Sequence, residues 1–274
     1  MSEPFTLPAT ERLYLDRDGV GYGAYRLDVA APSGVAPAAG WPSIWLLDAA
    51  GCFGTCVEAL HRMSRRSDAT GVSPMAVVGL SIVGDPYDAV RRGRDFTPSA
   101  KGSGKVDGSG GEAADFLSFL NGQVMNAVCD RVVLDRDRRT LFGHSLAGYF
   151  ALWTLFHHPA AFRGYVAISP SIWWDRDLLF NAASVPARQG RRLFMAVGEW
   201  EEALPPWQVG KAGSEELRAR RQARRMIANA RELEEILRRT SEPDHVDFMA
   251  MAREDHASIV STAMPHALRL ASTF

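Results

Sequence analysis

The centre of the chain carries the sequence Thr140-Leu141-Phe142-Gly143-His144-Ser145-Leu146-Ala147-Gly148-Tyr149. Its first four residues predict the end of a short buried strand, and residues 149–157 predict an amphipathic helix. Small residues, Gly143 and Ala147, lie two positions before and after Ser145. This spacing is typical of a nucleophile elbow, a strained strand-to-helix turn in which larger side chains would collide. A serine that only caps the helix is the alternative, but both flanks have the structure that an elbow needs.

Apolar strands and helices alternate on both sides of this turn. The predicted strands are residues 43–47, 75–83, 164–168, 192–197 and 245–251, and the predicted helices are 55–66, 112–133, 214–239 and a last helix at the C-terminus. Continuous apolar strands that alternate with helices indicate a parallel sheet buried on both faces. Residues 12–15 and 22–29 predict an antiparallel hairpin at its edge. The alternation therefore predicts an α/β fold with a mostly parallel sheet, this hairpin, and helices on both faces, in one domain over residues 1–274. Together with the elbow at Ser145, this arrangement is that expected of an α/β-hydrolase fold.

Residues 84–111 interrupt the alternation. The part from Arg91 to Pro98 is basic and contains Phe96, whereas residues 101–111 are rich in glycine and serine. A connection of this length in a compact domain implies a functional or mobile loop. A merely solvated loop is the alternative interpretation of its arginines.

Composition limits the classes of partner. The net charge is −1, and glutamates alternate with arginines later in the predicted helix that contains the arginine-rich run from Arg218 to Arg225, so we expect a solvated helix face and no nucleic-acid site. No window approaches the ~20 apolar residues of a membrane span, and the N-terminus lacks the pattern of a leader peptide, which predicts a cytoplasmic protein. Cys52, Cys56 and Cys129 lack the spacing of a zinc site, so we expect free thiols, no metal and no cofactor.

A serine hydroxyl needs a base to accept its proton during attack, and histidine suits that role near neutral pH. In α/β-hydrolases the base follows the last strand, which selects His256. The other histidines lie on predicted helices, in the elbow or at a strand end, and we expect structural roles for them: His61, His144, His157, His158, His245 and His266.

The same order places the orienting acid after the strand at 192–197, where Glu201 is the first candidate and Glu199 the second. A serine-histidine dyad oriented by a backbone carbonyl is the alternative. The oxyanion hole needs two backbone N–H donors. Leu146 follows the nucleophile and supplies one, and Ala50, or alternatively Ala49, supplies the other from the loop after residues 43–47.

Two tryptophans, Trp173 and Trp174, follow the strand at 164–168. They wall a ligand cavity or pack the loop onto the core, and the sequence favours neither interpretation.

From about Ile44 to His256 the chain resembles the α/β-hydrolase esterases that open catecholate siderophore trilactones, the enterobactin and salmochelin esterases. Their larger family also holds feruloyl esterases and S-formylglutathione hydrolases. The resemblance depends on four segments in order: Arg94-Asp95-Phe96-Thr97-Pro98, Gly110-Gly111-Glu112-Ala113-Ala114-Asp115-Phe116, Gly143-His144-Ser145 and Ser169-Pro170-Ser171-Ile172-Trp173-Trp174. The sequence differs from the family at Asp48-Ala49, where the family has Asp-Gly, and at Ala147-Gly148, where it has Gly-Gly.

The resemblance implies Ser145 as nucleophile, His256 as base, and Arg92 or Arg94 near the mouth of a cavity that receives an anionic ferric catecholate. We therefore predict a serine esterase whose small-molecule substrate is a siderophore, with Trp173 and Trp174 as further binding residues. A general carboxylesterase or acyltransferase is the alternative enzyme, and a ligand-binding homologue without catalysis is the alternative from another class.

Overall fold

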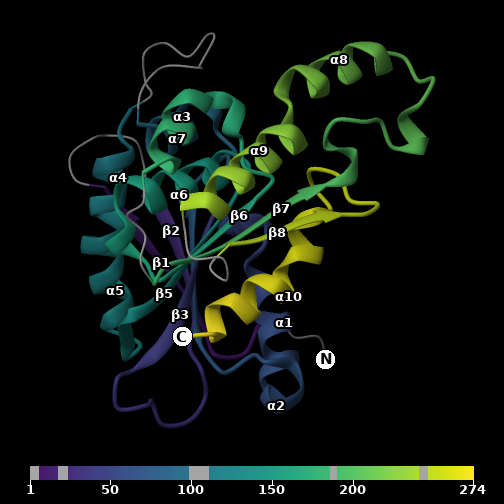
Figure 1. Ribbon diagram of the computed structural model, residues 1–274. Helices are drawn as coiled ribbons and strands as arrows, with labels where there is room; N and C mark the ends of the chain where they lie inside the picture. Colours follow the sequence, from purple (N-terminus) through teal and green to yellow (C-terminus); the bar gives the residue numbers. More distant parts are fainter. Residues whose placement is uncertain (1–5, 18–23, 99–110, 186–189, 241–245) are drawn as a thin grey trace.

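The computed structural model describes residues 6–17, 24–98, 111–185, 190–240 and 246–274. An eight-stranded sheet runs through the molecule in the order β1-β2-β4-β3-β5-β6-β7-β8 (Figure 1). The strands are β1 (Thr10–Asp16), β2 (Ala24–Ala30), β3 (Trp41–Leu47), β4 (Ala76–Ile82), β5 (Leu134–His144), β6 (Gly164–Ile168), β7 (Arg192–Gly198) and β8 (Val246–Met251). The first two strands pair antiparallel, β2 joins β4 antiparallel, and every later pair is parallel. The predicted α/β-hydrolase fold and its N-terminal hairpin are confirmed.

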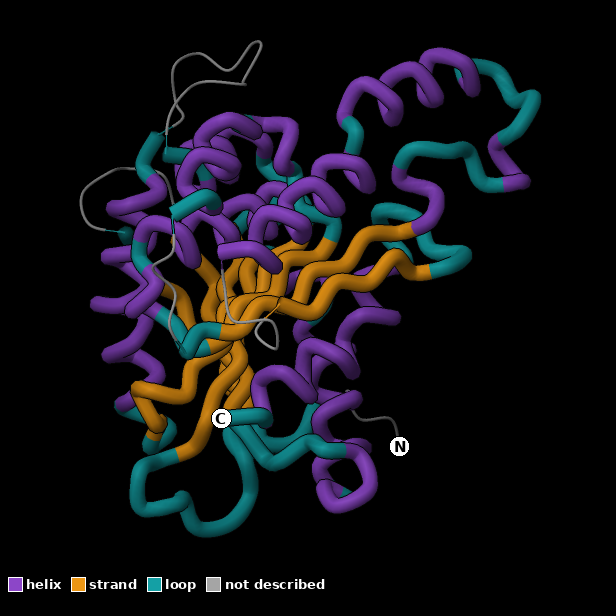
Figure 2. Tube along the Cα trace, in the orientation of Figure 1, coloured by secondary structure: helices purple, strands orange, loops and turns teal. Residues whose placement is uncertain are grey.

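Helices cover both faces of this sheet (Figure 2). They are α1 (Phe53–Ser64), α2 (Ser67–Thr70), α3 (Ala89–Phe96), α4 (Ala113–Phe119), α5 (Met125–Cys129), α6 (Leu146–His157), α7 (Arg176–Ala183), α8 (Ser214–Arg224), α9 (Met226–Thr240) and α10 (Ile259–Ser272). One core cluster joins the sheet to α4, α5, α6, α7 and α9, and the other joins it to α1 and α10. Because β3, β4, β6 and β7 are largely apolar on both faces, they are buried between these two layers, and β5 is buried mainly in its second half.

The structure corrects the prediction for residues 84–111. Helix α3 forms in the first half of this segment, where the Asp88 side chain accepts hydrogen bonds from the backbone N–H groups of Val90 and Arg91. This cap satisfies two of the donors that a helix N-terminus leaves unpaired. The glycine- and serine-rich part falls mostly on residues 99–110, which lie outside the described residues.

Two predicted helices are each divided. The helix expected over 112–133 consists of α4, a π-helical turn over Leu120–Val124, and α5. The helix expected over 214–239 is divided at Arg225, whose φ of 48° is left-handed, into α8 and α9. This break lets α8 project away from the α/β layers (Figure 1). Among the described residues, no helix combines the length and apolarity that crossing a membrane requires.

Candidate active site

Ser145 lies in a strained turn between β5 and α6. Its φ of 58° and ψ of −118° are unusual for a residue with a side chain. Its backbone N–H donates to the carbonyl of Ile168 over 2.9 Å, which fixes the turn to β6. A Cβ atom at Gly143 would lie 2.0 Å from the carbonyl oxygen of Ala147, so the turn requires glycine there. Such strain costs about 1–3 kcal/mol and persists where the surrounding structure enforces it, often at functional sites.

Two side chains from distant parts of the chain align with Ser145. His256 lies between β8 and α10, and its Nε2 atom is 3.1 Å from Ser145 Oγ. Its Nδ1 atom is 2.8 Å from Oε2 of Glu201, in a short 3₁₀ turn over Glu199–Glu201 after β7. A carboxylate at Nδ1 selects the tautomer with the proton on Nδ1, which leaves Nε2 to accept the serine proton.

Glu201 is held in place on its other side. Its Oε1 atom accepts hydrogen bonds from the Ser169 hydroxyl and, over 3.4 Å, from the backbone N–H of Gly198. Burial by itself would raise the pKa of Glu201, but the hydrogen bond and positive potential of His256, with the bonds from Ser169 and Gly198, lower that pKa below its ordinary value. The second candidate acid, Glu199, instead accepts from the backbone N–H of Arg253 over 2.7 Å. The geometry therefore pairs Glu201, and not Glu199, with His256.

His144, in the elbow, also contacts His256. Its Nε2 atom is 2.7 Å from the backbone carbonyl oxygen of His256, and the two ring centroids are 4.7 Å apart. Burial, and next the proximity of His256, lower the pKa of His144 to about 3, so its ring is neutral and Nε2–H donates to that carbonyl. The sequence predicted a structural residue here and gave no signal for this contact, because the partners are 112 residues apart in the chain.

The residues predicted to donate backbone hydrogen bonds to the oxyanion lie at the starts of two helices. Leu146 is the first residue of α6, and Ala49 and Ala50 begin a 3₁₀ turn over Ala49–Gly51 directly after β3. The leading N–H groups of a helix have no partner within that helix. Ala49 is buried and Ala50 is exposed. The methyl group of Ala49 lies beside Gly79, where an added Cβ would come within 2.8 Å of it, so a glycine in β4 makes room for alanine at this position.

A cavity of about 460 Å³ opens above Ser145. Its lining combines the reacting groups with aromatic and basic side chains. The lining residues are Ala89, Arg92, Ser145, Leu146, Ser171, Trp173, Trp174, Trp200, Glu201, Leu217, Arg220, Arg221, Arg224, Met226 and His256. Trp173 and Trp174, in a 3₁₀ turn over Ile172–Trp174, thus lie in the wall of the cavity. A second cavity of about 380 Å³ shares Arg92, Ser145 and His256 with the first, so space is present on two sides of the serine.

The two arginines predicted at the cavity mouth have different places. Arg92 lines both cavities, and its Nε and Nη2 atoms donate to Oδ2 of Asp48 over 3.0 and 2.7 Å. The guanidinium of Arg92 is therefore paired with Asp48. Burial raises the pKa of Asp48, and the nearby Arg92 guanidinium opposes that rise.

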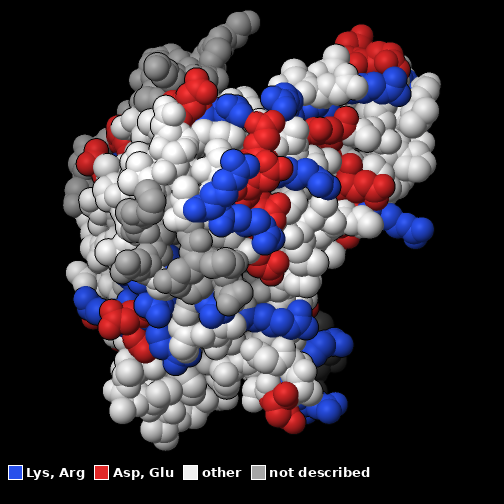
Figure 3. Space-filling view, in the orientation of Figure 1, with Lys and Arg blue, Asp and Glu red and all other residues white. Residues whose placement is uncertain are grey.

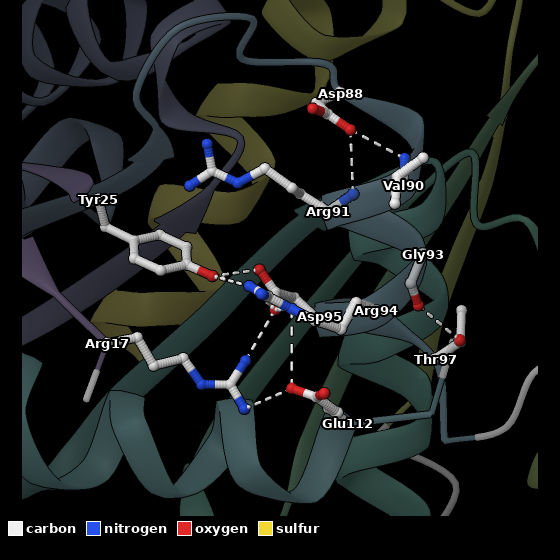
Figure 4. Close-up of polar contacts among 10 residues, drawn as sticks. All are labelled: Arg17, Tyr25, Asp88, Val90, Arg91, Gly93, Arg94, Asp95, Thr97 and Glu112. Atoms are coloured by element: carbon white, nitrogen blue, oxygen red, sulfur yellow. Dashed lines mark hydrogen bonds and ion pairs between the residues drawn. The ribbon is translucent and has the colours of Figure 1, made fainter. Parts of the chain in front are cut away.

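The prediction for Arg94 is wrong. Arg94 is buried, and its guanidinium donates to Asp95 Oδ1 and to the Tyr25 hydroxyl, each over 2.7 Å (Figure 4). Arg17 donates to the same Asp95 oxygen over 2.8 Å and lies 3.1 Å from Glu112. This cluster joins β1, β2, α3 and the start of α4 outside both cavities at Ser145. A buried guanidinium needs a carboxylate partner, and Asp95 provides it.

The sequence missed three arginines of the cavity. Arg220, Arg221 and Arg224 belong to α8, in the run predicted to be a solvated face. With Leu217 they follow the spacing i, i+3, i+4 and i+7, which places all four on one side of a helix. That spacing was the available signal, but nothing in the sequence shows that this side of α8 faces the elbow.

Comparisons with known proteins identify the family of this chain. The chain is 32% identical over 286 residues to "Ferri-bacillibactin esterase BesA" of Bacillus subtilis, with 98% of this chain and 92% of the relative covered. It is 31% identical to "Siderophore triacetylfusarinine C esterase" of Aspergillus fumigatus, with 97% and 94% covered. The crystal structure of the BES protein from Bacillus cereus superimposes with a TM-score of 0.83 at 28% identity, over 100% of this chain and 98% of that one. The sequence profile of the "Putative esterase" family matches residues 23–270, and the chain belongs to this family of carboxylic ester hydrolases.

Proposed function

We propose that this protein is a serine esterase that hydrolyses the ester bonds of a catecholate-type siderophore and so supports the release of its iron. The observation that carries the proposal is the line of contacts from Ser145 Oγ through His256 to Glu201, at the floor of a cavity walled by tryptophans and arginines. Relatives that match nearly the whole chain are named as esterases of siderophores, which supports the substrate class.

The proposed reaction proceeds in two halves. Ser145 Oγ attacks the ester carbonyl carbon while His256 Nε2 accepts the hydroxyl proton, and the C–O bond to the leaving alcohol then breaks as Nε2 returns that proton to it. Water next attacks the acyl-serine with Nε2 as base, which releases the carboxylic acid and restores Ser145. Glu201 stabilises the imidazolium that forms in each half, because its carboxylate lies at Nδ1.

Negative charge develops on the carbonyl oxygen in both halves. We assign its stabilisation to the backbone N–H of Leu146 and to a second N–H from Ala49 or Ala50. Each such donor contributes about 3 kcal/mol to transition-state stabilisation in serine hydrolases.

The cavity suits a large substrate with aromatic and anionic parts. Trp173, Trp174 and Trp200 offer flat apolar surfaces to catechol rings, and Arg92 adds positive charge beside Ser145. A ferric tris-catecholate carries a charge of about −3, which arginine recognises well. Iron is part of the substrate in this proposal and not a resident cofactor.

We place the reaction in the cytoplasm. Cys52 and Cys56 are buried free thiols, and Cys129 is also free. Free cysteines are typical of a reducing compartment, where disulfides are rare.

Product analysis tests the proposal. Purified protein and the Ser145→Ala variant are incubated with iron-free and ferric trilactone siderophores and with a small aryl ester, and products are separated by liquid chromatography and identified by mass spectrometry. We expect linear siderophore fragments with the unchanged protein and none with Ser145→Ala. Turnover of the small ester alone would contradict the siderophore assignment and indicate a general carboxylesterase. Absence of turnover on every ester would indicate a ligand-binding homologue without catalysis.

A further inference from the structure

One side of α8 faces the cavity above Ser145. Leu217, Arg220, Arg221 and Arg224 all line that cavity together with Ser145 and His256. They come from a helix that projects from the α/β layers (Figure 1), and the space-filling view shows basic and acidic side chains side by side on this projection (Figure 3). The cavity therefore has a cationic wall opposite the catalytic groups.

The break at Arg225 gives α8 this position. Its left-handed backbone ends α8, and the Asn229 side-chain amide donates to the carbonyl of Arg224 over 3.1 Å, which satisfies an acceptor at the helix end. Asn229 is itself buried at the start of α9. This hydrogen bond ties the C-terminal end of α8 to the buried start of α9.

The three cavity arginines form no close ion pair with the residues that the structure describes. No carboxylate among these residues lies within 4.0 Å of the guanidinium groups of Arg220, Arg221 or Arg224. Arg221 donates to the Ala203 carbonyl over 2.6 Å, and its charge adds to the effect of Ser258 in lowering the pKa of Asp255. The one acid in the described lining, Glu201, is bonded to His256. Arg218, on the same helix but outside the lining, does pair with Glu215 at 3.0 Å.

Arg224 is also held against an aromatic ring. Its guanidinium carbon lies 4.6 Å from the centroid of the Trp173 ring, a cation–π arrangement that orients the guanidinium plane. Burial, and next the positive charge of the nearby Arg220, lower the pKa of Arg224. A bound anion would offset the repulsion between these two guanidinium groups.

We propose that Arg220, Arg221 and Arg224 form an anion-binding face that selects substrates by charge and holds the anionic part of the substrate above Ser145. For the natural substrate this inference rests on the proposed function. A ferric catecholate is strongly anionic, whereas free catechols are protonated near neutral pH, so this face favours the ferric form. The substrate class is an ester of an anionic acid or chelate with planar rings that stack beside Trp173.

Two synthetic esters isolate the effect of charge. The probes are 4-nitrophenyl butyrate, which is neutral, and the mono-4-nitrophenyl ester of glutaric acid, which carries one carboxylate. In the variant with Arg220→Gln, Arg221→Gln and Arg224→Gln, we expect kcat/KM for the anionic ester to fall on the order of tenfold, because the local field that concentrates anions is lost. We expect kcat/KM for the neutral ester to fall clearly less than for the anionic ester, because the neutral ester carries no charge for that field to attract.

Arg218→Gln is the matched control, since it removes one charge from the same helix outside the cavity. Arg218→Gln should leave kcat/KM unchanged for both the neutral and the anionic ester. Replacing the three arginines by lysine should keep the preference for the anionic ester, and salt should weaken that preference in the unchanged and lysine proteins, because ions screen charges over about 10 Å at 0.1 M. Equal losses on both esters, or no loss on the anionic ester, would overturn the inference.

This result is separate from the siderophore test because neither probe is a siderophore. If siderophores are cleaved but the glutamine variant keeps its charge preference, only the α8 inference fails. If the charge preference depends on α8 but no siderophore is cleaved, only the proposed substrate fails.

Discussion

The contact between His256 and Glu201 can be tested by removing one charge. Glu201→Gln keeps the size of the side chain but cannot stabilise an imidazolium, and an amide can select the wrong tautomer at Nδ1. We expect kcat to fall by about 10²–10⁴-fold while KM changes little. Glu199→Gln is the control, because Glu199 contacts Arg253 and not His256. Similar kcat values for both variants would show that the serine and histidine act without this acid.

His144 makes stability depend on pH. The pKa of His144 is about 3 in the folded protein, whereas a histidine in an unfolded chain has a pKa of ~6.5. Between these two pH values the unfolded chain therefore binds a proton that the folded chain does not. The free energy of unfolding therefore falls as pH drops through this window, by up to about 1.4 kcal/mol per pH unit from this residue. Above the window His144 contributes no pH dependence.

His144→Gln removes this titration and keeps an amide N–H that can donate to the His256 carbonyl. Urea unfolding at several pH values between about 4 and about 7 should give a shallower loss of stability for His144→Gln than for the unchanged protein. His61→Gln, at an exposed position of α1, serves as the control. Parallel curves for His144→Gln and the unchanged protein would contradict this account.

At the scale of elements, α3 is fixed at both ends. Asp88 caps its N-terminus, and near its C-terminus the buried Asp95 accepts from Tyr25, Arg17 and Arg94 (Figure 4). Because α3 also carries Arg92 beside Ser145, this cluster positions part of the cavity wall. The Arg-Asp-Phe-Thr-Pro segment that supported the family resemblance thus has a packing role in this structure.

Asp95→Asn should be more destabilising than Asp88→Ala. The first removes the charge of the buried carboxylate that Arg94 and Arg17 share, and losing one partner of a buried ion pair costs about 3–5 kcal/mol. The second removes only a helix cap, which costs about 1 kcal/mol. Chemical denaturation of both variants at neutral pH measures the difference. A loss for Asp95→Asn no larger than that for Asp88→Ala would contradict the role given to the cluster.

The sequence predicted the sheet and the elbow well because their signals are local. Buried parallel strands are continuous apolar runs, and the elbow has a fixed spacing of small residues around Ser145. Helix α3 was missed because it is short and half of its residues are charged. The break at Arg225 was missed because arginine gives no signal for a left-handed backbone.

Contacts between residues that are far apart in the chain could not be predicted from the sequence. The burial of Arg94 depends on Tyr25 and Arg17, which precede it by about seventy residues or more. The position of α8 depends on how α9 packs, so the same arginine run is compatible with a solvated face or a cavity wall. The order of strands in the sequence did predict that Ser145, His256 and Glu201 lie at one end of the sheet. The loops that follow parallel strands meet at that end.

For the whole molecule, the central claim is that one activated serine lies where a siderophore binds. Labelling with a fluorophosphonate, followed by peptide mapping, tests both parts together. We predict one label per chain, on the peptide that contains Ser145, much slower labelling in His256→Ala, and slower labelling of the unchanged protein when a ferric siderophore is present. Labelling at another residue, or labelling of Ser145 at a rate that saturating siderophore leaves unchanged, would contradict the claim.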